Sequence, residues 1–220
     1  MTKNVNVIYG TQLGDEGKAR ILDQIVSKYE FDNLVLRYNG GANSGHTCVI
    51  EGVGKFIFHQ IPSGGFNPKS TNVVGAGAFV DPELFLEEIK EIKSKEVAIG
   101  KIFVSSRAHI VFPFYKMLDG IEEELRKGNE IIGTTKRGIG VCASFKYARV
   151  GIRAGDLFSN RIKSMVKSCV NYANIFMKHY EKPLIKEEDI LNLIGSWEKD
   201  FKTYIKDCIP IIQDYLSNDR

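Results

Sequence analysis

The nine residues Gly10–Lys18 read GTQLGDEGK, and this stretch decides how the start of the chain is interpreted. It follows a short β-type apolar run, Val5–Tyr9, and precedes a helical pattern, Ala19–Val26. A glycine-rich turn between a strand and a helix is typical of a phosphate-binding loop, because free backbone N–H groups and the helix dipole both favour an anion there. The sequence therefore predicts an anion-binding loop of the P-loop kind.

The stretch departs from the usual P-loop pattern, G-x-x-x-x-G-K-[ST]. Gln12 stands where the first glycine is expected, and Ala19 stands where the hydroxyl residue is expected. Two acidic residues, Asp15 and Glu16, lie inside the loop instead. A carboxylate beside bound phosphates repels them unless it holds a metal ion or carries out proton chemistry. The loop therefore predicts a catalytic or metal-binding carboxylate.

Composition and charge narrow the class of protein. The 220 residues are 26% charged and 43% hydrophobic, which is typical of a globular domain. The net charge of +3 is too small to indicate a nucleic-acid partner. No apolar run approaches the ~20 residues of a membrane span. The four cysteines are widely spaced without a C-x-x-C pair, which is typical of reduced thiols. We expect a cytoplasmic protein with no nucleic-acid and no membrane partner.

The first part of the chain alternates strands and helices. A helix is predicted after Asp81-Pro82, with a buried stripe of Leu84, Phe85, Ile89 and Ile92, and another from Pro113 to Lys127. Such alternation predicts an α/β fold with a mainly parallel sheet flanked by helices. Strands are predicted at Val5–Tyr9, Asn33–Arg37, Lys55–His59, Thr71–Gly75 and Lys101–Ser105.

From about residue 160 the pattern becomes helical. Apolar residues recur at helical spacing from Ile162 to Tyr172, and Glu187–Trp197 and Phe201–Leu216 are also predicted to be helices. We expect residues 1–158 to form the α/β core and residues 159–220 a helical segment of the same domain. Ligands of parallel sheets bind beyond the carboxyl ends of the strands, which places the site after Tyr9, Arg37 and His59.

Five ordered blocks within residues 5–158 resemble the adenylosuccinate synthetase family. The family usually has tryptophan at the position of Leu13 and Gly-Lys at that of Ala19-Arg20. The blocks are Gly10–Lys18, Val35–Thr47 (VLRYNGGANSGHT), His59–Gly64 (HQIPSG), Gly75–Pro82 (GAGAFVDP) and Ile132–Gly140 (IGTTKRGIG) leading into Lys146–Leu157. The chain resembles the N-terminal portion of the family. Family members continue beyond this length, with motifs for guanine and aspartate that are absent here.

The resemblance implies a ligase of de novo AMP synthesis. Such an enzyme couples GTP, IMP and L-aspartate, with Mg²⁺, to give adenylosuccinate, GDP and phosphate. The 6-oxygen of IMP first attacks the γ-phosphorus of GTP, and the aspartate amine then displaces the new phosphate. The first step needs a base at N1 of the hypoxanthine, and the second needs an acid near the leaving oxygen.

The resemblance also implies roles for particular residues, and the residue types suit those roles. Asp15 matches the catalytic base, which also binds magnesium together with the carbonyl of Gly45. His46 matches the general acid, and its ordinary pKa near 6.5 suits proton transfer at cellular pH. Asn43, Thr135 and Arg149 match IMP-binding residues, and Arg149 reaches the partner subunit's site in a homodimer. The GTP-binding positions are Gly14, Glu16, Gly17, Lys18, Gly45 and Thr47.

Several alternatives remain open from the sequence. His59 follows a predicted strand and either takes part in the site or simply packs. His109 is expected either to be structural or to support a site residue from behind. A viral-type relative that acts on dGMP would share much of the pattern, although the presence of Asp15 favours IMP. A truncated nucleotide-binding module without turnover is the non-enzymatic alternative.

Overall fold

The computed structural model describes residues 5–12, 16–26, 28, 32–50, 52, 54–128 and 131–217. Its strands are β1 (Asn33–Gly40), β2 (His46–Ile50), β3 (Gly54–Phe58), β4 (Ser70–Val80), β5 (Lys101–Ser105), β6 (His109–Ile110) and β7 (Ile205–Lys206). Its α-helices are α1 (Lys18–Val26), α2 (Pro82–Ser94), α3 (Pro113–Leu125), α4 (Ile139–Tyr147), α5 (Ile162–His179), α6 (Glu187–Phe201) and α7 (Cys208–Ser217). Short 3-10 helices are η1 (Ser63–Phe66), η3 (Ala154–Asp156) and η4 (Lys202–Tyr204).

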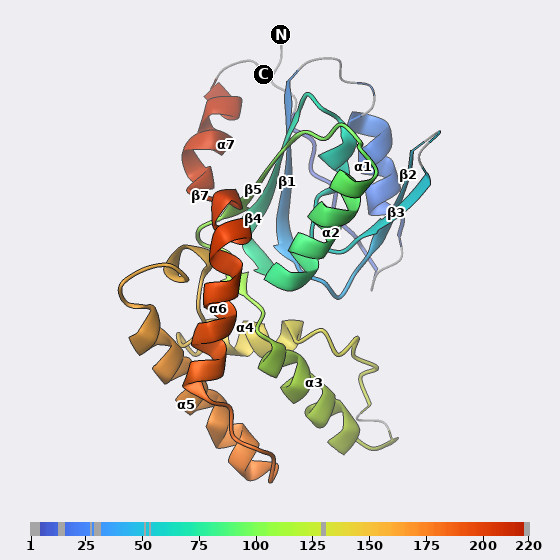
Figure 1. Cartoon of the computed structure of the whole chain (residues 1–220). Helices are drawn as coiled ribbons and strands as arrows, with labels where there is room; N and C mark the ends of the chain where they lie inside the picture. Colours follow the sequence, from blue (N-terminus) through green and yellow to red (C-terminus); the bar gives the residue numbers. More distant parts are fainter. Residues whose placement is uncertain are drawn as a thin grey trace.

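A five-stranded sheet lies in the upper part of the molecule as drawn in Figure 1. Four strands follow the order β1-β4-β5-β7, β6 also pairs with β4, and every pair is parallel. Strands β2 and β3 form a separate antiparallel hairpin. The predicted α/β fold with a mainly parallel sheet flanked by helices is thus confirmed.

Helix α2 begins where the sequence predicted. The side chain of Asp81 caps it by accepting a hydrogen bond from the backbone N–H of Leu84 at 3.4 Å, and Pro82 occupies its first turn. Phe85, Ile89 and Ile92 are buried as one stripe. Leu84, which was predicted in that stripe, is only half-buried, because it lies at the margin of the apolar face.

Two glycines permit β1 and β4 to approach closely. The pairing of β1 with β4 shifts register between Arg37 and Asn39. A side chain at Gly77 would bring its Cβ to 2.2 Å from the carbonyl oxygen of Tyr38, and one at Gly75 would meet the carbonyl oxygen of Arg37 at 3.0 Å. Glycine at both positions therefore allows this irregularity within the parallel sheet.

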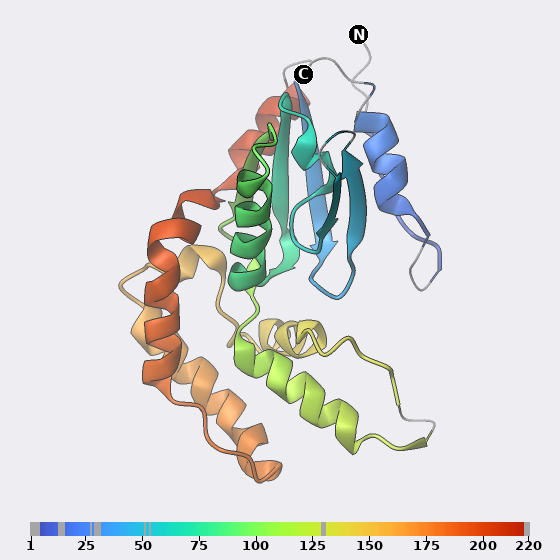
Figure 2. The same cartoon turned by 45° about the vertical axis from the view of Figure 1, so that its right-hand side comes forward.

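The two faces of the sheet are covered unequally. Helix α1 and the hairpin lie on one side, where η1 packs against Val35 of β1. Helix α7 lies on the opposite side, where the Tyr215 hydroxyl donates to Thr71 Oγ1 of β4 at 2.9 Å. Figure 2 shows α7, in red, and α1, in blue, on opposite sides of the strands.

Helices α3, α4 and α5 lie beyond the carboxyl ends of β1 and β4 (Figure 1). Aromatic rings form much of their common core. Phe145 packs edge-on against Tyr115 at 4.7 Å and against Tyr172 at 4.9 Å between ring centroids. None of the described helices is both long enough and apolar enough to cross a membrane.

Three strand or helix predictions were wrong in detail. Residues 5–10 have no regular secondary structure, and Val5, Val7 and Tyr9 are exposed, because β-type alternation alone does not form a strand without a neighbouring strand to pair with. Lys55–His59 is mostly strand, as β3, but it pairs antiparallel with β2 because the connection between them is too short for a parallel crossover. Phe201–Leu216 is not one helix, since β7 interrupts it to pair with β5.

Candidate functional site

The loop before α1 carries the first group of predicted site residues. Gly14 and Asp15 lie outside the described residues, so their roles stay predictions. Glu16 forms an ion pair with Lys18 and accepts a hydrogen bond from the backbone N–H of Gln12 at 2.5 Å. The contact with Lys18, more than that with Gln12, lowers the pKa of Glu16. Gly17 has a φ of +70°, which glycine adopts readily, at the turn into α1.

The second predicted loop connects the end of β1 to the start of β2. Asn43, Gly45 and Thr47 are exposed, and His46 is half-buried as the first residue of β2. The His46 ring packs edge-on against Phe58 of β3 with 5.8 Å between centroids. Its Nε2 is buried without a hydrogen-bond partner in the described structure. The loop thus presents exposed polar groups beside one titratable ring.

His46 is held neutral by its surroundings. Burial lowers its pKa to about 4, and the charges of Arg37 and His59 add to this effect. At neutral pH the free protein therefore holds an uncharged imidazole. A general acid must carry a proton, so this ring needs an added negative charge nearby before it can donate one.

His59 lies directly against the same loop. A Cβ built on Gly45 would lie 2.6 Å from His59 Cε1 and 2.9 Å from His59 Nδ1. Glycine is therefore required at position 45 by the close approach of the imidazole. The structure brings Gly45, His46 and His59 together. Like Nε2 of His46, Nδ1 of His59 is buried and has no hydrogen-bond partner in the described structure.

Two charged side chains hold the backbone of the segment His59–Ile61: Glu88, which is buried, and Arg37, which is half-buried. Glu88 of α2 accepts hydrogen bonds from the backbone N–H groups of His59 at 2.6 Å, Gln60 at 3.1 Å and Ile61 at 3.0 Å. Arg37 of β1 donates to the carbonyl oxygen of His59 and, at 2.6 Å, to that of Gly41. Arg37 therefore links the two loops that carry His46 and His59.

Sequence reasoning did not identify either of these charged residues as part of the site. Burial raises the pKa of Glu88 to about 6, while its three backbone N–H donors and Arg37 oppose that rise. The sequence held a weak signal for Glu88, because this residue adjoins Ile89 on the apolar face of α2. In the structure Glu88 is only 3% exposed. A buried carboxylate of this kind is expected only where donors surround it.

The third predicted group lies on the connection from α3 to α4 and at the end of α4. Glu123 accepts hydrogen bonds from the backbone N–H groups of Gly133 at 2.6 Å and Thr134 at 3.3 Å. Thr135 is exposed. Arg149 is also exposed and has a φ of +62°. These residues come from segments separate from His46 and Lys18, beyond the carboxyl ends of the strands.

The described residues contain no cluster of three or more side chains that could hold a metal ion. Magnesium is usually bound through one or two carboxylates together with substrate phosphates and water. The Gly45 carbonyl and the loop carboxylates are hard oxygen donors, which fit such an ion. The predicted magnesium site therefore remains chemically reasonable, with Asp15 outside the described residues.

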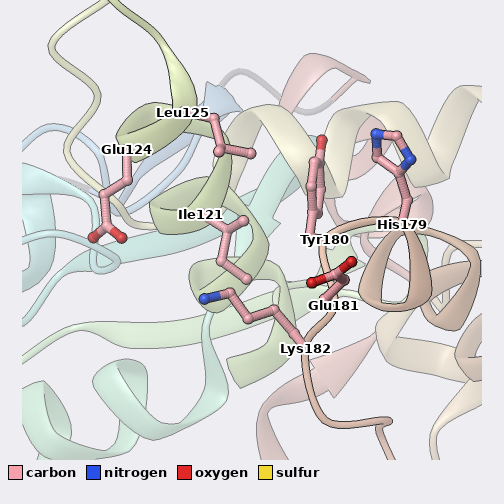
Figure 3. Close-up of a pocket in the computed structure, with 7 residues that line it drawn as sticks. All are labelled: Ile121, Glu124, Leu125, His179, Tyr180, Glu181 and Lys182. Atoms are coloured by element: carbon pink, nitrogen blue, oxygen red, sulfur yellow. The ribbon is translucent and has the colours of Figure 1, made fainter.

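One hollow of the described structure is not part of this site. It has a volume of about 360 Å³ and lies between α3 and the end of α5 (Figure 3). Figure 3 shows Ile121 and Leu125 on the α3 side and His179–Lys182 on the other. None of the predicted site residues lines it.

Comparisons with known proteins agree on one family. The family model described as adenylosuccinate synthetase matches residues 7–220. The adenylosuccinate synthetase of Dehalococcoides mccartyi is 39% identical over 220 residues, covering 98% of this chain and 50% of the relative. That of Lactococcus lactis subsp. lactis is 40% identical over 212 residues, covering 96% of this chain and 48% of the relative.

Solved structures agree with these matches. Fully ligated adenylosuccinate synthetase from Plasmodium falciparum superposes with a TM-score of 0.81 at 32% identity, covering 96% of this chain and 48% of that one. Succinoaminodeoxyadenylate synthetase of cyanophage S-2L, bound to dGMP and dATP, shares the fold with a TM-score of 0.52 at 19% identity, covering 72% of this chain and 45% of that one.

The chain spans about half the length of the curated relatives it matches. The fold, the ordered motifs and the family match over residues 7–220 point the same way. The chain belongs to the adenylosuccinate synthetase family.

Proposed function

We propose that this chain forms the IMP-binding half of an adenylosuccinate synthetase, a GTP-dependent ligase that joins L-aspartate to IMP. The observation that carries the proposal is the environment of His46. Its imidazole lies on the first residue of β2, directly after the glycine-rich loop that follows the parallel strand β1, and its buried Nε2 has no described partner. That is the position and the residue type that a proton donor to a bound ligand needs.

Proton transfer is assigned to two residues. Asp15 removes the proton from N1 of the hypoxanthine as the 6-oxygen attacks the γ-phosphorus of GTP. His46 then donates a proton towards the phosphate that leaves as the aspartate amine attacks C6. Magnesium, held by Asp15 and the Gly45 carbonyl, would neutralise phosphate charge when bound.

The low pKa of His46 is compatible with an acid that is charged only in the complex. A phosphate brought next to the ring would stabilise the imidazolium and raise its pKa from the value of about 4 in the free protein. In this scheme, ligand binding and protonation of His46 occur together.

The remaining predicted residues bind the two nucleotides. Lys18 would break its ion pair with Glu16 and contact the phosphates of GTP. Gly14, Gly17 and Thr47 would lie beside it. Asn43 and Thr135 would contact IMP, and Arg149 would reach the IMP phosphate of the partner subunit in a homodimer. We propose these functions for residues 1–158 of a cytoplasmic enzyme, with residues 159–220 as a helical segment of the same domain.

The test is a coupled assay with GTP, IMP and L-aspartate. The assay mixture contains this chain and the half of the Dehalococcoides mccartyi synthetase that it does not match. Formation of adenylosuccinate, with loss of turnover in Asp15→Asn, supports the assignment. Production of a ligated dGMP instead would favour the viral-type reaction, and IMP binding without any ligation would favour a binding module.

A further inference from the structure

Helix α3 carries two carboxylates that bond to the backbone of the connection leading to α4. Asp119 and Glu123 lie four residues apart, which places them on the same face of the helix. Asp119 is buried, and its Oδ2 accepts a hydrogen bond from the backbone N–H of Gly138 at 2.9 Å. Glu123 is half-buried and accepts hydrogen bonds from the N–H groups of Gly133 at 2.6 Å and Thr134 at 3.3 Å. The two carboxylates therefore hold opposite ends of one short segment.

This segment, Gly133–Gly138, has a specific backbone shape. Lys136 has a φ of +51° and Gly138 a φ of +72°. A Cβ on Gly138 would lie 2.8 Å from the backbone nitrogen of Lys116, so glycine allows the segment to contact the first turn of α3. A lysine in the left-handed region costs stability, and such a conformation persists only where surrounding contacts maintain it. The hydrogen bonds to Asp119 and Glu123 are contacts of this kind.

The middle of the segment is left available to a ligand. Thr135 and Lys136 are exposed. The backbone N–H groups of Thr135, Lys136 and Arg137 have no hydrogen-bond partner among the described residues. The hydroxyl oxygen of Thr134 is buried and also lacks a partner there. The two carboxylates thus bond to the ends of the segment and leave its central donors for an anion.

Two further contacts fix the segment relative to the rest of the site. Lys116 of α3 forms an ion pair at 2.5 Å with buried Asp81, the cap of α2, which directly follows β4. Ile139, the residue after the segment, lies against the loop that follows β1, because a Cβ on Gly41 would lie 2.5 Å from Ile139 Cδ1. Asn43, a proposed IMP contact, belongs to the same loop. The segment therefore ends beside the loop that carries Asn43.

We propose that Asp119 and Glu123 are positioning residues for phosphate recognition. They hold Gly133–Gly138 so that Thr135 and the central N–H groups face the phosphate of the bound nucleotide. The proposal rests on the proposed function, in which Thr135 contacts IMP, and names the residues that place Thr135. Neither carboxylate is assigned a contact with the ligand, so both act through the backbone of the segment.

The charge of the carboxylates separates this role from a simple electrostatic one. Burial acts to raise the pKa of Glu123, but hydrogen bonds from Arg126, Gly133 and Thr134 lower it overall, so this side chain is ionised at neutral pH. Loss of a negative charge near a phosphate strengthens anion binding by Coulomb's law. Loss of an anchor of the segment weakens anion binding instead. A substitution at Glu123 or Asp119 therefore distinguishes the two roles by the sign of its effect.

The experiment measures the dissociation constants of IMP and inosine for this chain and its variants by nuclear magnetic resonance titration. Glu123→Ala should weaken IMP binding by at least about tenfold, the equivalent of one hydrogen bond to a charged group, and inosine binding by less than about twofold. Glu123→Gln keeps a side-chain oxygen as acceptor and should recover most of the IMP affinity. Asp119→Ala and Asp119→Asn should behave as the same kind of pair. Glu122→Ala is the matched control, since it removes an equal charge from a side chain paired with Arg126 at 4.0 Å, and should weaken neither ligand.

Three results would overturn the positioning role. They are IMP binding that is unchanged or tighter in both alanine variants, an equal loss for IMP and inosine, and amide signals of Thr135–Arg137 that keep their positions in those variants. Circular dichroism and urea unfolding check that each variant is folded. Where Asp119→Ala does not fold, Glu123→Ala carries the test by itself. A parent chain that binds IMP no better than inosine overturns the proposed function and this proposal with it, whereas unchanged IMP binding in the variants removes only the positioning role.

Discussion

Single residues in this chain adopt conformations and protonation states that cost stability. Arg149 follows α4 in the left-handed region, with a φ of +62°. Its N–H bonds to the Lys146 carbonyl and that of Val150 to the Phe145 carbonyl, each at 3.1 Å, which is the pattern that usually places glycine at this position. A large residue here is destabilising, and its persistence agrees with a role in ligand binding.

Arg149→Gly should therefore stabilise the fold and weaken IMP binding. We expect a gain of about 1 kcal/mol in the free energy of unfolding, because glycine relieves the left-handed strain. Urea unfolding and calorimetry with IMP measure the two effects. Glu181→Gly is the matched control, since Glu181 has a φ of +54° at the end of α5, and it should gain stability without affecting IMP. If Arg149→Gly keeps full IMP affinity, the binding role is wrong.

The neutral state of His46 predicts a pH dependence of stability. In the unfolded chain the ring takes up a proton near pH 6.5, whereas in the fold its pKa is about 4. The contribution of neutral His46 to the free energy of unfolding is fully present above pH 6.5 and is lost as the pH falls from 6.5 to 4. Its full size is about 3 kcal/mol. Asp23 and Glu88, whose pKa values burial raises to about 6, contribute with the opposite sign, since their stabilisation is lost as the pH rises towards 6.

Comparison of variants isolates the contribution of His46 to the pH dependence of stability. Urea unfolding of His46→Gln at pH 7 and pH 4.5 should show a smaller loss on acidification than the parent chain does. His109→Gln is a useful reference, because burial also lowers the pKa of His109 to about 4. A nuclear magnetic resonance titration that places the pKa of His46 near 6.5 in the free protein would contradict the account.

At the scale of elements, α2 does more than cover the sheet. Glu88 holds the peptide groups of His59, Gln60 and Ile61 through their N–H groups, and Arg37 of β1 holds the segment through its carbonyls. The hairpin end, the helix and the edge strand are thereby joined, because both side chains bond to the backbone of one segment. The position of His59 against Gly45 depends on this arrangement.

Glu88→Ala should strongly destabilise the chain, by about 3–5 kcal/mol, because it leaves the buried backbone N–H groups of His59, Gln60 and Ile61 without their acceptor. Thermal and urea unfolding measure the loss. Glu87→Ala, the exposed neighbour on the same helix, should change stability by less than about 0.5 kcal/mol. At a temperature where Glu88→Ala is still folded, the His46 and His59 ring signals should shift. Unchanged signals would show that the two loops keep their positions without Glu88.

At the scale of the whole molecule, the chain contains most of the proposed IMP contacts but only part of the proposed reaction site. It spans about half the length of its relatives, and the resemblance implies that the guanine and aspartate motifs belong to the part of the family that this chain does not match. Orientation of reactants can account for ~7–11 kcal/mol of a reaction barrier, so an incomplete site should lose most of its rate.

We therefore expect the isolated chain to bind IMP weakly and to form little or no adenylosuccinate. Calorimetry with IMP and the coupled assay with all three substrates, both without a second polypeptide, measure the two parts. Inosine, which lacks the phosphate, is the control ligand and should bind more weakly than IMP. Robust ligation by the isolated chain would mean that residues interpreted as scaffold recognise guanine and aspartate.

The sequence by itself determined the features that depend on local chemistry. Asp81 and Pro82 specify the start of α2, the alternation of strands and helices specifies a mainly parallel sheet, and the ordered glycine-rich motifs identify the family. Only the tertiary structure decided which segments pair and which buried charges meet. Val5–Tyr9 has the alternation of a strand but is not one, and Lys55–His59 belongs to a hairpin, because strands depend on neighbours distant in sequence. The Arg37–Glu88 arrangement could not be predicted for the same reason: it joins residues 51 positions apart, and their burial becomes favourable only when both sets of donors and acceptors converge.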